Sequence, residues 1–255
     1  MDKIIYAIMG NNCPEQEMED LLKGITGISG SSLYALSFKN ISVAISDFSS
    51  STFVVSKEMA IDFARVIEQL SQELTLLPVR FGTFLKSNED ILRLMTDHYG
   101  SFYNNLLKVW DKDEFGLKVI WDYEKGSGKI REEAEKEEVK SDTYFTKTTV
   151  HTNYLLEKIK KHKLEDALLR HVEKLIDEII SLLVGINPEC KFKKMVSNSL
   201  ILDGVFLIEK DNKDEFVQAI ETLKQQHNDL HLLLTGPWPP YSFVEIDQSF
   251  NKENK

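Results

Sequence analysis

The stretch that decides the fold is "SLYALSFKNISVAISDFS", residues 32–49. It contains two β-prone runs separated by the polar residues at 39–40. In the second run the apolar residues Ile41, Val43 and Ile45 alternate with small or polar ones, which is the period of a strand with one buried face. The stretch therefore predicts a β-hairpin.

The segments on either side of this hairpin complete a pattern of strands and helices. An apolar run at 3–10 precedes it, followed by an amphipathic helix at 14–24 that opens with Pro and ends with Gly. After the hairpin, a helical pattern covers 56–73 and a strand pattern covers 74–85. The order β-α-β-β-α-β is that of a ferredoxin-like domain.

The second half of the chain repeats this order. Strand patterns at 115–123 and 230–246 enclose a helix at 213–228 and a hairpin at 197–210, whose turn we place at Asp203-Gly204. The sequence therefore predicts an α+β protein with two ferredoxin-like domains, related by an old duplication.

The second domain differs from the first by a large helical insertion at about 124–190. The insertion opens with dense charge and continues with an apolar stripe at helical spacing, which predicts two helices broken near His162 to Leu164 or one long bent helix. The organisation that we expect is an N-terminal domain at 1–86, a connecting helix at 87–114, a C-terminal domain at 115–247 and a polar tail at 248–255.

The composition argues against several classes of function. The chain has 255 residues and a net charge of −10, so it lacks the positive balance of a general nucleic-acid binder. Its two cysteines, Cys13 and Cys190, form no CxxC pair, which fits a reducing compartment. The apolar segment 175–186 carries two acids and is too short to span a membrane, and 1–10 does not resemble a signal peptide. We expect a cytoplasmic protein without a nucleic-acid partner or a membrane span.

The sequence offers no catalytic or metal-binding motif. "KGSGK" at 125–129 has the composition of a phosphate-binding loop without its spacing. His227 and His231 straddle the end of a predicted helix, so the i, i+4 geometry of a metal site is lost, and "DKDE" at 111–114 is typical of a polar turn. We predict no catalytic residue, cofactor or metal, and a protein that is not an enzyme, although an enzyme with a dispersed site stays an alternative.

Two segments combine proline, glycine and aromatic residues at the end of a closing strand. The first contains Arg80, Phe81 and Gly82 after Pro78, and the second is the stretch 235–243. A rigid loop that carries aromatic residues can act as a structural clasp or as a preformed partner surface. The candidate residues for a structural clasp or a partner surface in the two segments are Arg80, Phe81, Gly82, Trp238, Pro239, Pro240 and Tyr241.

The same two segments, "LLPVRFGTFL" (76–85) and "TGPWPPYSFV" (235–244), resemble those of the gas vesicle protein F/L family (GvpF/GvpL). The two segments fit F and L alike, and between the two we lean to F. The opening "IIYAIMG" (4–10) and "GITGIS" (24–29) also fit, so the resemblance covers essentially the whole chain. It implies an N-terminal ferredoxin-like domain and a second one with added helices. It also implies a non-enzymatic accessory protein of gas vesicle formation, found in the cytoplasm and on the gas vesicle.

The partner that the resemblance implies is the small hydrophobic shell protein GvpA, together with other gas vesicle proteins. Such a protein would chaperone the shell protein or nucleate its assembly. We expect its contact surface on the helical insertion at 141–185 or on the sheet face of the N-terminal domain. The alternative is a tandem ferredoxin-like protein that binds a ligand or regulates another process, since that fold hosts many functions.

Overall fold

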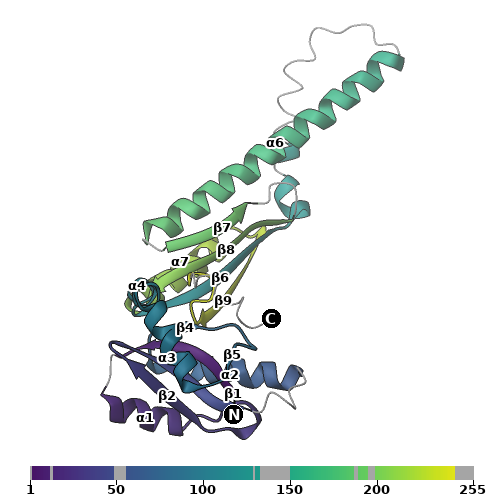
Figure 1. The fold of residues 1–255 in the computed structure, drawn as a ribbon. Coiled ribbons are helices and arrows are strands. Elements are labelled where there is room, and N and C mark those ends of the chain that lie inside the picture. The colour runs from purple at the N-terminus through teal and green to yellow at the C-terminus, as the bar shows by residue number, and fades with distance from the viewer. Residues whose placement is uncertain are drawn as a thin grey trace. The chain divides into compact units, whose positions relative to one another are not determined.

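The computed structural model describes residues 2–11, 14–48, 56–128, 130–132, 150–186, 189–194 and 199–244. Of the predicted charged run that opens the insertion, 124–140, residues 129 and 133–140 lie outside the described residues, as does the predicted polar tail. The chain forms two compact units: unit 1 is Met1–Glu114 with the chain from Pro237 on, and unit 2 is Phe115–Gly236. Each unit combines helices with its own β-sheet (Figure 1).

Unit 1 contains the predicted β-α-β-β-α-β order. Its elements are β1 (Asp2–Gly10), α1 (Glu15–Lys23), β2 (Leu33–Phe38), β3 (Ile41–Phe48), α2 (Lys57–Glu73), β4 (Leu76–Pro78) and β5 (Phe84–Leu85). The strand order is β2-β3-β1-β4, and β5 also pairs with β1. The single closing strand that we predicted is therefore two short strands, both antiparallel to β1.

The predicted hairpin is confirmed. Strands β2 and β3 pair from Leu33↔Ser46 to Phe38↔Ile41, which leaves two residues as the turn. Lys39 adopts a left-handed φ of 53° there. The Asn11 side chain donates a hydrogen bond of 3.1 Å to its carbonyl, which helps to hold that conformation.

Helices cover both faces of the sheet in unit 1. Ile4 and Tyr6 of β1 share a core with residues of α1 and α2, whereas Ile5 and Ile8 are equally buried but lie outside that core. Two further helices, α3 (Asn88–Asp97) and α4 (Tyr99–Lys108), contact the same sheet, α3 at β2 and α4 at β1, β3 and β4. Burial on both sides explains why β1 reads as one continuous apolar run.

Helices α3 and α4 correct two of our expectations. The predicted connecting helix is broken at His98, whose φ and ψ of −110° and 11° are not helical, and both pieces belong to unit 1. Because these helices cover the sheet, the sheet face of the N-terminal domain is not available as a partner surface. Ser87 caps α3, because its side chain accepts a hydrogen bond from the Asp90 amide.

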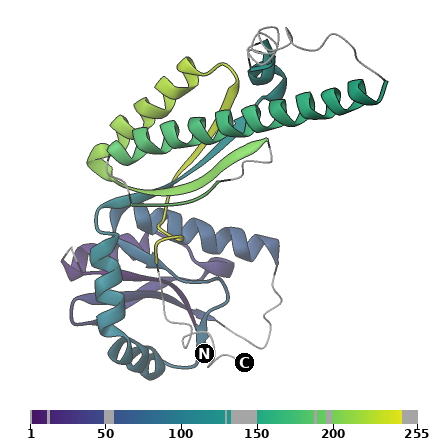
Figure 2. The same cartoon turned by 90° about the horizontal axis from the view of Figure 1, so that it is seen from above.

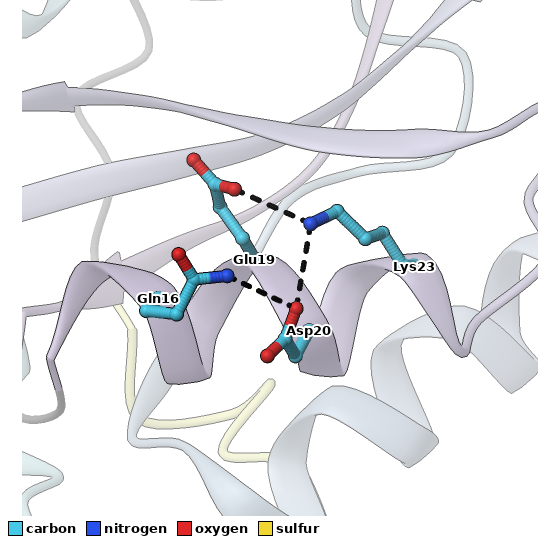
Figure 3. Close-up of polar contacts among 4 residues, drawn as sticks. All are labelled: Gln16, Glu19, Asp20 and Lys23. Carbon is cyan, nitrogen blue, oxygen red and sulfur yellow. Dashed lines mark hydrogen bonds and ion pairs between the residues drawn. The ribbon is translucent and has the colours of Figure 1, made fainter.

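Surface ion pairs support the short helix α1. Lys23 donates to Glu19 at 3.4 Å and to Asp20 at 3.3 Å, and Gln16 donates to Asp20 at 3.2 Å (Figure 3). The hydrogen bonds to Asp20 and then Glu19 raise the pKa of Lys23. These i, i+3 and i, i+4 contacts stabilise one turn of exposed helix, while Leu22 on the same helix packs into the core.

Unit 2 has the same sequential strand order as unit 1. Its elements are β6 (Lys112–Trp121), the helical residues 123–128 and 130–132, α6 (Val150–Gly185), β7 (Glu189–Lys194), β8 (Leu200–Glu209), α7 (Lys213–Gln226) and β9 (Leu230–Trp238). The sheet order is β7-β8-β6-β9, so the first strand of the unit lies between the third and the fourth, as β1 does in unit 1. Residues of α6 and α7 share one core with the sheet.

The predicted hairpin at 197–210 is wrong. Asp203 and Gly204 lie inside the continuous strand β8, and the strand that pairs with it is β7. Gly204 lies opposite Phe192 in this register, and a Cβ at Gly204 would meet the Phe206 ring at 3.2 Å. The glycine therefore makes room for two aromatic side chains rather than forming a turn.

Helix α6 is a single helix of 36 residues and has no break near His162. The sequence has neither proline nor glycine between residues 150 and 184, so nothing in it interrupts the backbone hydrogen bonds. Its C-terminal half packs on the sheet of unit 2 through buried residues from Leu168 to Leu183. Its N-terminal half extends beyond the sheet (Figures 1 and 2).

The chain does not end in unit 2, as our predicted boundary of 115–247 required. After β9 it returns to unit 1 at Pro237. The stretch 235–243 is therefore divided between the two units, and its proline-rich part is a component of the first.

Candidate functional site

The first candidate segment forms a tight turn that interrupts the edge of the unit 1 sheet. The Arg80 carbonyl accepts hydrogen bonds from the Thr83 amide at 3.2 Å and the Thr83 hydroxyl at 2.7 Å. Gly82, the third residue of this turn, has a φ of 87°, which is the conformation that a type II turn requires at this position. On either side of the turn, Val79 and Thr83 bond to the backbone of β1.

Phe81 fixes the turn to the core of unit 1. Its ring lies 5.3 Å from that of Phe63 in an edge-on arrangement, and Phe63 in turn stacks on Tyr6 at 5.1 Å. The backbone of the turn thus has an aromatic anchor, whereas the Arg80 side chain is exposed to solvent.

Replacing Gly82 by alanine should destabilise unit 1 by about 1 kcal/mol, because alanine is strained at positive φ. Gly100 is the matched control, since a Cβ there meets nothing within 4 Å and the residue is in α4. Gly100→Ala should stabilise the protein by up to about 1 kcal/mol. Urea unfolding of the two variants checks the opposite signs, and a neutral Gly82→Ala would contradict the turn assignment.

The second candidate segment also forms a tight turn, within unit 1. The Tyr241 amide donates to the Pro239 carbonyl at 2.7 Å, and the Phe243 amide donates to the Pro240 carbonyl at 3.2 Å. Both prolines and Phe243 are buried, and Phe243 is only 2% exposed. The prolines fix two φ angles, so the turn is preorganised.

A buried carboxylate holds this turn in place. Glu114 is 6% exposed, and its two oxygens accept hydrogen bonds of 2.7 Å from the backbone amide and the hydroxyl of Ser242. Ser242 thus supplies both hydrogen bonds to the charged carboxylate of Glu114. We predicted no role for Glu114, because the "DKDE" stretch is typical of a polar turn. The only indication in the sequence that Glu114 is buried was its position next to the strand residue Phe115.

Ser242 and Phe243 anchor the turn through the hydrogen bonds to Glu114 and through burial. Two of the candidate residues, Trp238 and Tyr241, are 45% and 49% exposed. Trp238 ends β9, and Tyr241 belongs to the turn, in which Pro239, Pro240 and Phe243 are buried. This arrangement combines a clasp with an exposed aromatic pair.

The hydroxyl of Tyr241 is harder to ionise than an ordinary phenol. Although half of the side chain is exposed, desolvation together with the charges of Glu68 and Glu114 raises its pKa to about 12. An unfolded tyrosine has a pKa of about 10. The folded state holds this proton more tightly, so the contribution of Tyr241 to stability is complete below pH 10 and is lost as the pH rises towards 12.

A spectrophotometric titration of tyrosinate tests this shift. The difference between the wild-type protein and Tyr241→Phe should show one tyrosine that ionises near pH 12. A difference curve centred on pH 10 would show that the hydroxyl is solvated like that of a free tyrosine.

Unit 2 contains a cavity of about 380 Å³ where three of its segments meet. It is bounded by the helical residues 123–128, by α6 and by the corner between α7 and β9. Its polar lining includes Lys125, His171, Lys174, Glu178, His227 and Asp229. The indole of Trp121 donates a hydrogen bond of 3.0 Å to Asp229, which orients one of these carboxylates.

The described residues show neither a metal-binding cluster nor a helix suited to a bilayer. In the ranges that the structure describes, His, Cys, Asp and Glu do not gather in groups of three or more that could hold a metal ion. Among those same residues, no helix has the length and apolar character needed to cross a membrane. Cys190 has a free thiol, whose pKa is raised by burial.

The chain is similar to known gas vesicle proteins in both sequence and structure. Gas vesicle protein F1 of Halobacterium salinarum is 21% identical over 234 residues, which cover 90% of each chain. Gas vesicle protein F of a Streptomyces species is 27% identical over 177 residues, covering 67% of this chain and 70% of the relative. The crystal structure of GvpF from an Anabaena species superposes with a TM-score of 0.75 at 19% identity, over 96% of this chain and 99% of that one.

The crystal structure of the Anabaena protein shows the same fold: mixed α and β structure with antiparallel sheets. A family model matches residues 3–245, a range that includes both candidate turns. The chain belongs to the family of gas vesicle synthesis proteins GvpL/GvpF.

Proposed function

We propose that this chain is a non-enzymatic accessory protein of gas vesicle formation, which binds the small hydrophobic shell protein GvpA to chaperone it or to nucleate its assembly. The observation that carries the proposal is the family match over residues 3–245. The protein would act in the cytoplasm and stay with the vesicle as a minor component. The net charge of −10 would keep the carrier soluble while it shields an apolar client.

We further propose that the two units are ferredoxin-like copies. The support is the strand order, in which the first strand of each unit lies between the third and the fourth. The helical insertion of the second copy then includes α6 and the helical residues 123–128 and 130–132.

The contact surface that we favour is the exposed pair Trp238 and Tyr241. Large aromatic residues contribute most of the binding energy in many interfaces, and a rigid turn lowers the entropy lost on binding. The turn at 80–82 is a second candidate, with Arg80 as a charged anchor. The exposed apolar residues of α6, such as Ile159 and Leu169, are the third.

Capture of purified protein by immobilised shell protein tests this surface. Trp238→Ala should weaken capture by about tenfold or more, as expected for an aromatic hot spot. Trp110→Ala is a matched control, because Trp110 is also in unit 1 and is 47% exposed. Equal effects of the two substitutions would reject the surface. Normal vesicles after deletion of the gene, with no capture of the shell protein, would reject the function itself.

The cavity in unit 2 supports the alternative of a ligand-binding protein. Its volume of about 380 Å³ falls in the range of small-molecule sites, and its lining mixes both signs of charge. Calorimetric titration with small zwitterions, compared between the wild type and His227→Ala, tests this alternative. Absence of heat with every compound would remove the support that the cavity lends to it.

A further inference from the structure

We propose that the cavity in unit 2 binds a small aliphatic amine in its protonated form, an alkylammonium ion, and that Asp229 holds its charged group. The cavity measures about 380 Å³, which is enough for a ligand of several heavy atoms. The proposal gives a chemical class to the ligand-binding alternative. It does not depend on the shell protein as a partner.

Asp229 is a carboxylate whose position is fixed and whose charge is unbalanced. Its Oδ2 atom accepts a hydrogen bond of 3.0 Å from the Trp121 indole, and its backbone carbonyl accepts one of 2.8 Å from the Asp122 amide. In the part of the chain that the structure describes, no basic side chain forms an ion pair with it. A carboxylate can accept about four hydrogen bonds, so Asp229 has acceptor capacity left on the wall of the cavity.

The charges of the cavity and its rim do not cancel. They belong to two lysines and three carboxylates: Lys125, Lys174, Asp122, Glu178 and Asp229. The Nζ atom of Lys125 lies 3.0 Å from the carboxylate of Asp122, and that of Lys174 lies 3.7 Å from the carboxylate of Glu178. With histidine counted as neutral, these two pairs balance and the charge of Asp229 remains. The site therefore lacks one positive charge.

The end of helix α7 adds negative potential at the same place. The helix ends at Gln226, and the residues from there to Asp229 line the cavity. The last carbonyl groups of a helix have no partners within it and act as about half a negative charge. The lysine of the last turn, Lys224, is engaged in an ion pair with Glu221. A cation is therefore favoured where these carbonyl groups and the carboxylate of Asp229 meet.

The apolar part of the lining favours an organic cation over an inorganic one. Leu175 of α6 and Ile130 line the cavity together with Asp229. An alkylammonium ion can place its methylene groups against these two apolar side chains, which removes apolar surface from water. Its ammonium group can donate three hydrogen bonds to carboxylate and carbonyl oxygens. The described His, Cys, Asp and Glu residues, by contrast, form no group that could hold a metal ion.

The indole N–H resonances of the three tryptophans test the site by nuclear magnetic resonance. Titration with n-butylammonium should shift the resonance of Trp121, whose indole donates to Asp229, with the millimolar affinity expected of so small a ligand. The resonances of Trp110 and Trp238, both in unit 1, should stay in place, and Trp110→Phe and Trp238→Phe assign them. Butyrate, with a chain of the same length and the opposite charge, should shift none. Ammonium should bind about tenfold more weakly or less, because it lacks the alkyl chain.

Three variants separate the charge of Asp229 from its place in the fold. Asp229→Asn keeps an oxygen that can accept the hydrogen bond from Trp121 and removes the charge, so the affinity for n-butylammonium should fall by about tenfold or more. Asp211→Asn is the matched control, since this acid is exposed, in unit 2 and outside the cavity, and it should leave the affinity unchanged. Lys174→Met should raise the affinity by about threefold or more, because it removes a cation that competes for Glu178.

Several outcomes would overturn the proposal. A resonance of Trp121 that stays in place with n-butylammonium does so, as does an equal response to butyrate or to ammonium. An equal loss of affinity in Asp229→Asn and Asp211→Asn would assign the effect to net charge and reject the site. If circular dichroism shows that Asp229→Asn does not fold, the sign of the Lys174→Met effect decides. Capture by the shell protein is tested at Trp238 in unit 1, so either hypothesis can fail while the other stands.

Discussion

Glu114→Ala should lower the free energy of unfolding by about 3 kcal/mol. The substitution removes two hydrogen bonds to a charged acceptor, those from the amide and the hydroxyl of Ser242, and hydrogen bonds to charged groups contribute about 1.5 to 3 kcal/mol each. Urea unfolding followed by tryptophan fluorescence measures the loss, since Trp110 and Trp238 are both in unit 1.

The Ser242→Ala variant separates the two hydrogen bonds. It removes the hydroxyl and keeps the amide, so it should cost about 1.5 kcal/mol. The double variant Glu114→Ala/Ser242→Ala should be no less stable than Glu114→Ala alone, because the hydroxyl has no carboxylate left to bind. Additive effects, or a loss below about 0.5 kcal/mol for Glu114→Ala, would contradict the clasp.

Gly126→Ala should be the most damaging small substitution in unit 2, with a loss of about 2 to 4 kcal/mol. A Cβ at Gly126 would lie 2.2 Å from the indole nitrogen of Trp121, where no real contact is possible. The ring must move, which disturbs its packing and breaks its hydrogen bond to Asp229. The fluorescence of Trp121 should shift towards that of an exposed indole.

Gly128 provides the control for this substitution. It is two residues further along the same helical segment, and a Cβ there meets nothing within 4 Å. Gly128→Ala should be neutral or slightly stabilising, because alanine favours a helix. Equal stability of the two variants would mean that Trp121 does not occupy the place described here.

Local patterns predicted most of unit 1. The alternation at Ile41, Val43 and Ile45 and the helical pattern at 56–73 depend only on neighbouring residues, and the hairpin and α2 begin and end close to where the sequence indicated. Each signal reports a period that local physics enforces. The mixed α and β class and the family followed from these elements and from the two proline-containing turns.

The elements that we missed depend on distant residues. Strand β7 is short and lysine-rich, so its alternation of Cys190 and Phe192 with lysine was hidden by the charge of the segment. The pair Asp203-Gly204 is a strong turn signal in isolation. Its place inside β8 is explained only by the rings of Phe192 and Phe206, which lie next to Gly204. Tertiary packing overrides local propensity at both positions.

The candidate turns were found as motifs, whereas their supports were not. Proline and glycine mark Gly82 and Pro239 in the sequence, but Ser242 and Glu114 have no local signature. A hydrogen bond between residues 128 positions apart leaves no period for a sequence pattern to show.

The return of the chain to unit 1 has a consequence for its biosynthesis. Glu114 and Ser242 are separated by 128 residues, and the whole of unit 2 lies between them. A ribosome that has just released Glu114 must translate unit 2 before the partner of that carboxylate exists. Domains generally fold in the order in which they emerge, and late, non-local contacts slow folding. Here the first unit to emerge is the last to be finished, so a nascent chain carries an incompletely closed N-terminal unit throughout the synthesis of the second.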